Sequence, residues 1–115
     1  MPTLYGIANC DTVKKAKKWL ESNNQDFSFH DYKKQGCPVS LVKEFTEHFS
    51  FEQLINKRGT TWRKLEDHVK ENLTDAGAIA LMSENSSLIK RPIFHHNKQW
   101  LIGFNEADYQ ASIKS

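Results

Sequence analysis

The sequence predicts a small α/β protein, because segments with the two-residue period of a strand flank a longer block with helical period. The chain opens in the order strand, helix, strand, which favours parallel strands joined by a right-handed crossover. It closes with two further strand patterns and a helical one. Its 115 residues are the size of one domain. We therefore expect a single domain over residues 1–115, built on a mixed four-stranded sheet.

The first three elements follow from short patterns near the N-terminus. The apolar run at residues 3–7 predicts a strand that ends just before Cys10. A helix should follow, because apolar residues recur at helical spacing among lysines. Asn23 and Asn24 should close this helix. Residues 27–32 alternate apolar and polar side chains, as a half-buried strand does.

The middle of the chain has helical period throughout. One helix should begin near Pro38 or Ser40 and present one apolar face, made of Leu41, Val42, Phe45 and Phe49. Residues 51–55 predict a short turn or helix. Caps at Thr60 and Thr61 predict one helix carrying Trp62, Leu65 and Val69, and Thr74 with Asp75 should cap another, carrying Ile79, Leu81 and Met82. This block, about residues 38–83, is the expected helical insertion between the second and third strands.

The last part of the chain predicts a hairpin and a helix. Residues 91–96 and 100–104 flank a polar turn, which is typical of antiparallel strands. Asn105 should cap a helix over residues 106–113. The full order, with its helical insertion, is a thioredoxin-like layout.

Composition excludes several classes of function. The net charge is only +2, with 16 basic and 14 acidic residues, which does not favour nucleic acid as a partner. No apolar run approaches the roughly 20 residues of a membrane span, and the N-terminus lacks the pattern of a signal peptide. Two distant cysteines do not form a disulfide framework. We therefore expect a cytoplasmic protein with reduced thiols and no membrane partner.

Cys10 is the strongest candidate for a chemically reactive residue. It lies where a strand gives way to a helix, and the amide end of a helix favours an anion such as a thiolate. A small buried apolar role is the alternative. Because Val13 stands where a C-x-x-C motif has its second cysteine, oxidised Cys10 would need an outside thiol, most plausibly glutathione, or Cys37. Cys37, just before Pro38, is better explained as a loop cysteine.

Three segments in order resemble the arsenate reductase (ArsC) superfamily, in particular its YffB-like branch, with the Spx regulators as a sister branch. They are Tyr5-Gly6-Ile7-x-Asn9-Cys10-Asp11-Thr12, Arg58-Gly59-Thr60-Thr61-Trp62-Arg63 and Ile89-Lys90-Arg91-Pro92-Ile93, and Gly103-Phe104-Asn105-Glu106 completes the pattern. The resemblance spans nearly the whole chain. It implies a thioredoxin-like (glutaredoxin-like) fold with a helical insertion and an N-terminal cysteine as the redox centre.

The resemblance also implies a binding site around that cysteine. Pro92 is expected in the cis form, facing the cysteine loop, with Arg91 beside it as a guanidinium donor for anions. Arg58 is expected to approach from the insertion, although related reductases place their arginine about two residues earlier, at Asn56 here. The remaining expected contacts are the side chain of Asn9, the backbone N–H groups of Asp11 and Thr12, and the charge of Lys14.

The implied activity is that of an oxidoreductase. Cys10 would attack a glutathione mixed disulfide or a small oxyanion, and glutathione, with glutaredoxin as a further candidate partner, would regenerate it. No permanently bound cofactor is expected, and the histidines lack the spacing of metal ligands, so we expect no metal site. Gly103 stands where glutaredoxin-linked arsenate reductases have a third arginine, which disfavours arsenate. The alternatives are a Spx-like regulator that binds RNA polymerase without catalysis, and a glutathione-binding protein without turnover.

Overall fold

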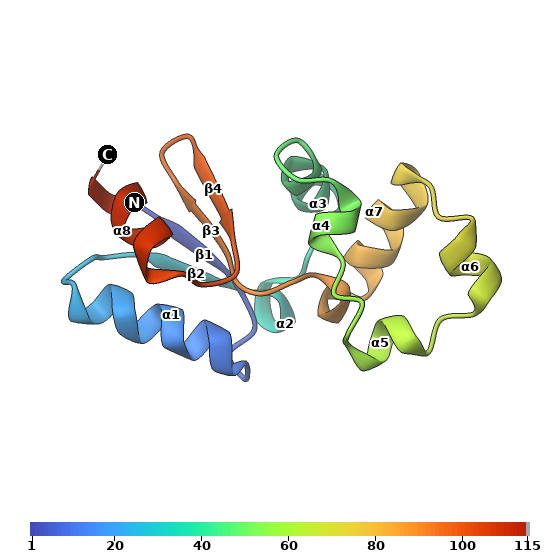
Figure 1. Ribbon diagram of the computed structural model, residues 1–115, viewed down its shortest axis with the longest axis horizontal. Coiled ribbons are helices and arrows are strands. Elements are labelled where there is room, and N and C mark those ends of the chain that lie inside the picture. The colour runs from blue at the N-terminus through green and yellow to red at the C-terminus, as the bar shows by residue number, and fades with distance from the viewer. Residues whose placement is uncertain (115) are drawn as a thin grey trace. The chain divides into compact units, whose positions relative to one another are not determined.

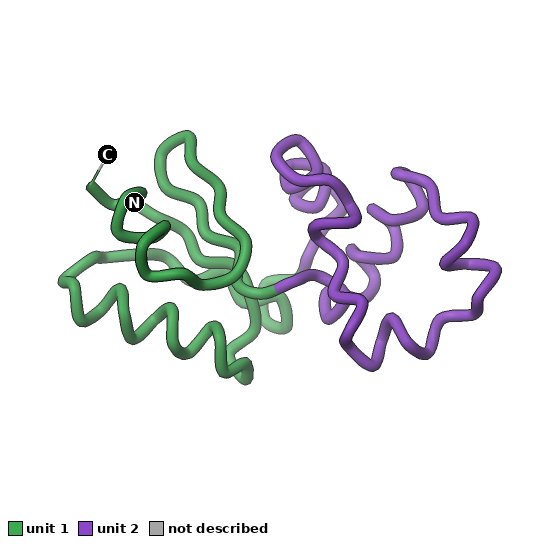
Figure 2. The backbone as a smooth tube through the Cα atoms, viewed as in Figure 1, with its two compact units in different colours: residues 1–36, 91–115 green, residues 37–90 purple. Residues whose placement is uncertain are grey.

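The computed structural model describes residues 1–114 and divides the chain into two compact units (Figure 2). Unit 1 contains residues 1–36 and the described residues from 91 onward, and unit 2 contains residues 37–90. Unit 2 holds the helices expected of the insertion, which the sequence placed at about residues 38–83. Whether the chain behaves as one domain stays a prediction. None of the helices described is long and apolar enough to cross a membrane.

Unit 1 contains the predicted mixed four-stranded sheet. Its strands are β1 (Thr3–Gly6), β2 (Ser28–Asp31), β3 (Ile93–His96) and β4 (Gln99–Ile102). Their order in the sheet is β2-β1-β3-β4 (Figure 1). β1 pairs in parallel with β2, whereas β3 pairs antiparallel with both β1 and β4. The α/β thioredoxin-like fold predicted from the sequence is confirmed.

Helices α1 (Asp11–Ser22) and α8 (Glu106–Lys114) pack on one face of this sheet. The buried residues that join the two layers are Leu4 and Phe94 from the strands, Val13, Ala16 and Leu20 from α1, and Tyr109 from α8. The rings of Phe94 and Tyr109 stack with centroids 4.5 Å apart. The predicted caps are confirmed, since Asn23 follows α1 and the Asn105 side chain accepts the N–H of Asp108 at 3.1 Å.

A short helix that the sequence did not predict follows β2. The second strand was expected to run to Tyr32, but Asp31 caps α2 (Tyr32–Gln35) instead. Its carboxylate accepts the N–H of Lys33 at 2.9 Å. A side-chain cap of this kind satisfies a free amide of the first turn, so it favours the helix at Tyr32 over further strand pairing.

Unit 2 is helical. Its elements are α3 (Val39–Thr46), α4 (Phe51–Leu54), α5 (Thr60–Arg63), α6 (Asp67–Glu71), α7 (Asp75–Glu84) and the 3-10 turn η1 (Ser86–Leu88). α3 packs against α7, with Val42, Phe45, Ala78 and Met82 buried. Thr74 caps α7 as predicted, accepting the N–H of Gly77 at 3.1 Å.

Three expectations for these helices are wrong. The predicted helix through Trp62, Leu65 and Val69 is two helices, because Glu66 adopts an extended conformation and starts α6. Neither Thr60 nor Thr61 is the cap: Gly59 precedes α5 and no side chain caps this helix. The Thr61 hydroxyl instead shares a 2.8 Å hydrogen bond with the hydroxyl of Ser87. α3 also ends at Thr46, whose hydroxyl donates to the Lys43 carbonyl at 2.8 Å, so Phe49 lies beyond the helix.

Gly6 allows the end of β1 to approach α1 closely. A Cβ atom at this position would lie 2.9 Å from Val13 Cγ2 and 3.9 Å from Arg91 Cβ. We expect Gly6→Ala to lower the free energy of unfolding by about 1–3 kcal/mol, the range for an overpacked core. Urea unfolding measures the loss. Val13→Ala should relieve much of it in the double variant, and equal costs in both backgrounds would contradict the steric explanation.

Candidate functional site

Cys10 is the N-cap residue of α1 and follows the end of β1. Its backbone is extended, with φ −143° and ψ 124°, and its carbonyl accepts the N–H of Lys14 at 2.9 Å. Its side chain is half-buried. The sulfur therefore lies at the amide end of a 12-residue helix, where the free N–H groups and the helix dipole favour a negative charge.

Four influences set the pKa of Cys10. Partial burial raises it, but the N–H of Val13, the guanidinium of Arg91 and the N–H of Thr12 outweigh burial and hold the pKa below the ordinary thiol value. Arg91 acts both as a hydrogen-bond donor and through its charge. The Cys10 side chain accepts no capping hydrogen bond of full geometry. The N–H groups of Thr12 and Val13 therefore lower its pKa mainly by electrostatic attraction. The arrangement favours the thiolate, which is the nucleophilic form.

Arg91 and Pro92 reach the site from the start of β3. The peptide bond between them is cis, as the resemblance implied. The N–H of Gly103 donates to the Pro92 carbonyl at 2.8 Å, and the Tyr109 hydroxyl donates to the Gly103 carbonyl at 2.7 Å. This chain of hydrogen bonds ties the Arg91-Pro92 segment to the end of β4 and to α8.

Gly103 supplies no charge to this region. Its φ is +80°, in the left-handed region that favours glycine, and no atom lies within 4 Å of the place a Cβ would occupy. The end of β4 therefore has room for a side chain but carries none. In unit 1, Arg91 is the guanidinium that acts on Cys10. A doubly charged oxyanion would find fewer donors here than at a site with an arginine in place of Gly103.

The other predicted site residues fall into two groups. Asn9, Asp11, Thr12 and Lys14 are exposed and surround Cys10 along the chain, at the bend before α1 and in its first turns. Arg58 is exposed in unit 2, where it lines a hollow together with Asn56, so its approach to Cys10 stays a prediction.

The two cysteines are both free thiols, but their surroundings differ sharply. Cys37 is 7% exposed in unit 2, and burial raises its pKa to about 11. Almost none of it is ionised near neutral pH, so it is a weak nucleophile. The structure therefore favours the thiolate form at Cys10 and the neutral thiol form at Cys37.

Sequence reasoning missed the amide of Val13. It named the backbone N–H groups of Asp11 and Thr12, whereas Val13 and Thr12 are the ones that act on the sulfur. The signal was present in the sequence, because an N-cap side chain addresses the amides two and three residues onward. With Cys10 as the N-cap, those are the amides of Thr12 and Val13.

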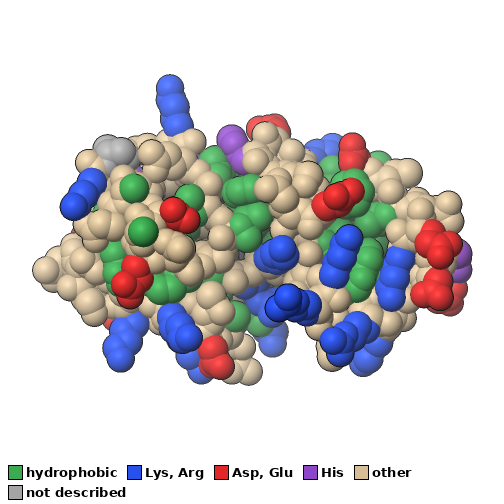
Figure 3. Space-filling model, viewed as in Figure 1, with side chains coloured by type: hydrophobic (Ala, Val, Ile, Leu, Met, Phe, Trp, Pro, Cys, Tyr) green, Lys and Arg blue, Asp and Glu red, His purple; other side chains and the backbone are tan. Residues whose placement is uncertain are grey.

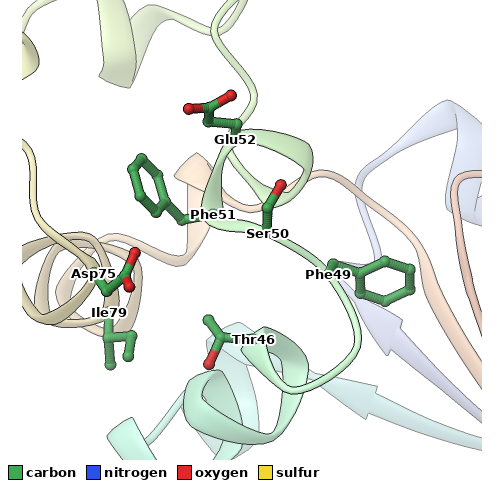
Figure 4. Close-up of a pocket in the computed structure, with 7 residues that line it drawn as sticks. All are labelled: Thr46, Phe49, Ser50, Phe51, Glu52, Asp75 and Ile79. Carbon is green, nitrogen blue, oxygen red and sulfur yellow. The ribbon is translucent and has the colours of Figure 1, made fainter.

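A separate hollow of about 300 Å³ lies in unit 2 between α4 and α7 (Figure 4). In the view, the ring of Phe51 and the side chains of Asp75 and Thr46 surround a common space, and Phe49 points away from it. No cysteine or cation lines it. Its carboxylates, Glu52 and Asp75, lie in the first turns of helices, where they stabilise the helix dipole. This hollow therefore offers no thiol chemistry.

The histidines do not assemble a metal site within the described part of the chain, where no group of three His, Cys, Asp or Glu residues is close enough. The His95 ring stacks on Trp100 with centroids 3.9 Å apart, and Nδ1 of His68 lies 3.1 Å from a Glu66 carboxylate. These side chains have structural or surface roles.

The fold and the cysteine at the start of α1 define a thioredoxin-like protein with a single-cysteine motif. The ArsC family profile matches residues 5–112, and the chain belongs to the ArsC family. The expected resemblance is thus confirmed.

Two relatives match nearly the full length of this chain. An uncharacterized protein of Haemophilus influenzae is 46% identical over 98% of this chain and 99% of its own length. The global transcriptional regulator Spx of Streptococcus pyogenes is 34% identical, covering 98% of this chain and 85% of its own length.

Solved structures give the same assignment. A protein named YFFB is 38% identical, with a TM-score of 0.92 over 97% of this chain and 98% of its own. An arsenate reductase (ArsC) related protein from Brucella melitensis is 43% identical, with a TM-score of 0.78 over 99% of this chain and 95% of its own. The chain is therefore similar both to reductase-related proteins and to regulators.

We expect Arg91→Gln to raise the pKa of Cys10, because the substitution removes a positive charge and weakens a donor to the sulfur. The thiolate forms as pH rises through this pKa, so the curve of iodoacetamide reactivity should move to higher pH. Lys14→Gln, which removes an exposed charge one turn away, is the matched control and should move the curve less. Equal movement in both variants would contradict a direct role for Arg91.

Proposed function

We propose that this protein is a glutathione-linked thiol–disulfide reductase whose nucleophile is the thiolate of Cys10. The observation that carries the proposal is the position of Cys10 at the N-cap of α1, within reach of the Val13 amide and the Arg91 guanidinium, which lower its pKa against the effect of burial. Membership of a family that includes arsenate reductase-related proteins supports redox chemistry. A glutathione-containing cytoplasm is the proposed location.

The proposed reaction has two thiol exchanges. In the first, the Cys10 thiolate attacks the glutathione sulfur of a mixed disulfide. A bond forms between the two sulfurs, and the substrate leaves as a thiolate that takes up a proton from solvent. In the second, the thiolate of a free glutathione attacks the Cys10 adduct, which releases oxidised glutathione and returns the Cys10 thiolate. Glutaredoxin is a proposed alternative source of the second thiol.

The proposed roles of the surrounding groups follow from their chemistry. Arg91 would hold a carboxylate of glutathione and stabilise charge on the sulfurs, with Arg58 as a further proposed anion donor. Pro92 would supply backbone beside the cysteine loop, and the amides of Thr12 and Val13 would stabilise the thiolate. Asn9 and Asp11 flank the sulfur along the chain and would contact the bound tripeptide. Lys14 would add positive potential.

Arsenate is a weaker candidate substrate. It is a dianion near neutral pH, and the position that would add a third arginine is Gly103. A disulfide of glutathione needs fewer cationic donors, because its negative charges are separate carboxylates. The same thiolate could attack either centre, so the charges around Cys10 decide between them.

Intact-mass measurement after incubation with oxidised glutathione tests the proposal. The wild type and Cys37→Ser should each gain one glutathionyl group, and Cys10→Ser should gain none. Loss of two hydrogen atoms without an adduct, abolished by either substitution, would indicate a Cys10–Cys37 disulfide. An adduct on Cys37 alone, or none on the wild type, would contradict the proposal.

A Spx-like regulator is the second candidate, favoured by the similarity to Spx proteins over 98% of this chain. The C-x-x-C motif often found in Spx proteins is absent here, since Val13 occupies the second position and is buried. Affinity capture of RNA polymerase from an extract separates the two functions. A stable complex that survives Cys10→Ser would favour the regulator. Saturable glutathione binding without turnover would favour a simple binding protein.

A further inference from the structure

Arg91 is the charged side chain that lowers the pKa of Cys10, so the position of its guanidinium matters for the reactive sulfur. The attraction between two charges weakens with distance, and a hydrogen bond needs an aligned donor. Lys14, Lys15 and Lys18 of α1 are exposed. On the face drawn in Figure 3, Lys and Arg side chains project from the edge of unit 1 that α1 forms, where salt screens their charge. The groups that hold the Arg91 segment in place therefore influence Cys10.

Tyr109 lies at the other end of a chain of hydrogen bonds that leads to this segment. Its hydroxyl donates to the Gly103 carbonyl at 2.7 Å. The Gly103 N–H donates to the Pro92 carbonyl at 2.8 Å, and Pro92 follows Arg91 directly. All of these residues belong to unit 1. A single hydroxyl on α8 thus holds the end of β4, which in turn holds the start of β3.

Gly103 has little conformational restraint of its own. Its φ is +80°, and no atom lies within 4 Å of the place a Cβ would occupy. Because glycine is free to adopt many backbone conformations, its two peptide groups need partners to keep one orientation. The Tyr109 hydroxyl is the partner of its carbonyl, and the Pro92 carbonyl is the partner of its N–H. Loss of the hydroxyl should therefore loosen both hydrogen bonds.

The ring of Tyr109 is fixed by packing, and its hydroxyl stays a donor. The side chain is 1% exposed, and its ring stacks on Phe94 and meets Trp19 and Phe104 edge to face. Burial raises the pKa of Tyr109 above its usual value, so the hydroxyl keeps its proton while Cys10 titrates. A phenylalanine would fill the same space in the core. The hydroxyl is thus the group whose role the packing does not explain.

We propose that Tyr109 is a positioning residue, whose hydroxyl keeps the Arg91 guanidinium in place beside the Cys10 sulfur. It acts through Gly103 and Pro92 and takes no part in breaking or forming bonds. Its effect on turnover rests on the proposed function of Cys10. Its effect on the thiolate does not, because the ionisation of a thiol is measured without any substrate of the enzyme.

Tyr109→Phe tests the proposal, because it removes the hydroxyl and keeps the ring. The curve of iodoacetamide reactivity against pH should move to higher pH, since a raised pKa delays formation of the thiolate. Below the wild-type midpoint the reactivity should fall roughly threefold, less than in Arg91→Gln. The double variant should match Arg91→Gln alone, because no guanidinium is left to position. No movement in Tyr109→Phe, or additive movements in the double variant, would overturn the proposal.

Ser83→Ala is the matched control. The Ser83 hydroxyl also donates to a backbone carbonyl at 2.7 Å, that of Cys37, and both residues lie in unit 2. Urea unfolding should show a loss of stability in Ser83→Ala and in Tyr109→Phe, but the reactivity curve should move in Tyr109→Phe alone. The same movement in both variants would mean that the curve follows stability in general, and the positioning role would be wrong.

Hydrogen exchange tests the path between the two residues. The Gly103 amide should exchange faster in Tyr109→Phe than in the wild type, because its hydrogen bond to Pro92 opens more often. Unchanged protection of this amide, together with a moved reactivity curve, would overturn a path through Gly103.

Reaction of Cys10 with 2-hydroxyethyl disulfide separates this proposal from the proposed function. This disulfide is neutral, so its rate follows the thiolate and not the binding of an anion. Tyr109→Phe should be slower than the wild type below the wild-type midpoint and equal to it at higher pH, and a loss at every pH would contradict the positioning role. A wild type that reduces no disulfide would contradict the reductase, while the iodoacetamide curves would still decide the role of Tyr109.

Discussion

Cys10→Ser is expected to reduce the turnover of glutathione mixed disulfides to the uncatalysed background, which is the largest functional effect of any single substitution in this chain. A serine hydroxyl is not ionised near neutral pH, so the amides of Thr12 and Val13 and the charge of Arg91 have no anion to stabilise. The measurement is the rate of disulfide reduction with glutathione as the electron source.

Cys37→Ser is the matched control, because it removes the other sulfur. Burial raises the pKa of Cys37 to about 11, so this thiol contributes almost no thiolate at neutral pH. Turnover should stay close to that of the wild type. A comparable loss in both variants would mean that the two cysteines act together, and the single-thiolate scheme would be wrong.

Phe94→Ala is expected to give the largest loss of stability, about 3–5 kcal/mol, the range for deleting a buried aromatic side chain. Phe94 is fully buried in β3, and its ring stacks on Tyr109 with an interplanar angle of 16°. Removing it leaves a cavity between the sheet and α8. Urea unfolding followed by circular dichroism should show a lower midpoint.

Two further variants are controls for the stability loss of Phe94→Ala. Phe94→Leu fills part of the cavity and should lose clearly less than Phe94→Ala. Val39→Ala alters a side chain that is 44% exposed and should change stability by no more than about 0.5 kcal/mol. Similar losses for Phe94→Ala and Val39→Ala would contradict the assignment of Phe94 to the core of unit 1.

The sequence predicted those elements whose cause is local. The hairpin of β3 and β4 follows from a polar turn between alternating runs, and α1 follows from an apolar stripe that Cys10 caps. The break before α6 could not be predicted in this way, because Glu66 becomes extended within a segment of continuous helical period. The role of Thr61 was missed because its hydroxyl bonds to that of Ser87, which is distant in sequence. Contacts of this kind depend on the tertiary fold, and spacing along the chain does not reveal them.

The candidate site also combines features with a local cause and features that depend on the tertiary fold. The position of Cys10 at a helix start is a local property, and it was visible as a strand followed by a helix pattern. Its contact with Arg91 joins segments from opposite ends of the chain, and the resemblance to a family implied it where residue spacing did not. The hollow of unit 2 that Arg58 lines was not predicted, because Lys57 and Lys90 come to line it only through the pairing of Ile55 with Ile89.

Val13 has a consequence beyond the packing of α1. It stands where a C-x-x-C motif has its second cysteine, so the helix turn that carries the nucleophile has no internal reductant. For a reductase of this design, each catalytic cycle ends only when a second molecule arrives. The lifetime of the modified state is then set by the concentration of thiols in the surrounding medium, and the fraction of protein carrying an adduct follows the redox balance of its compartment.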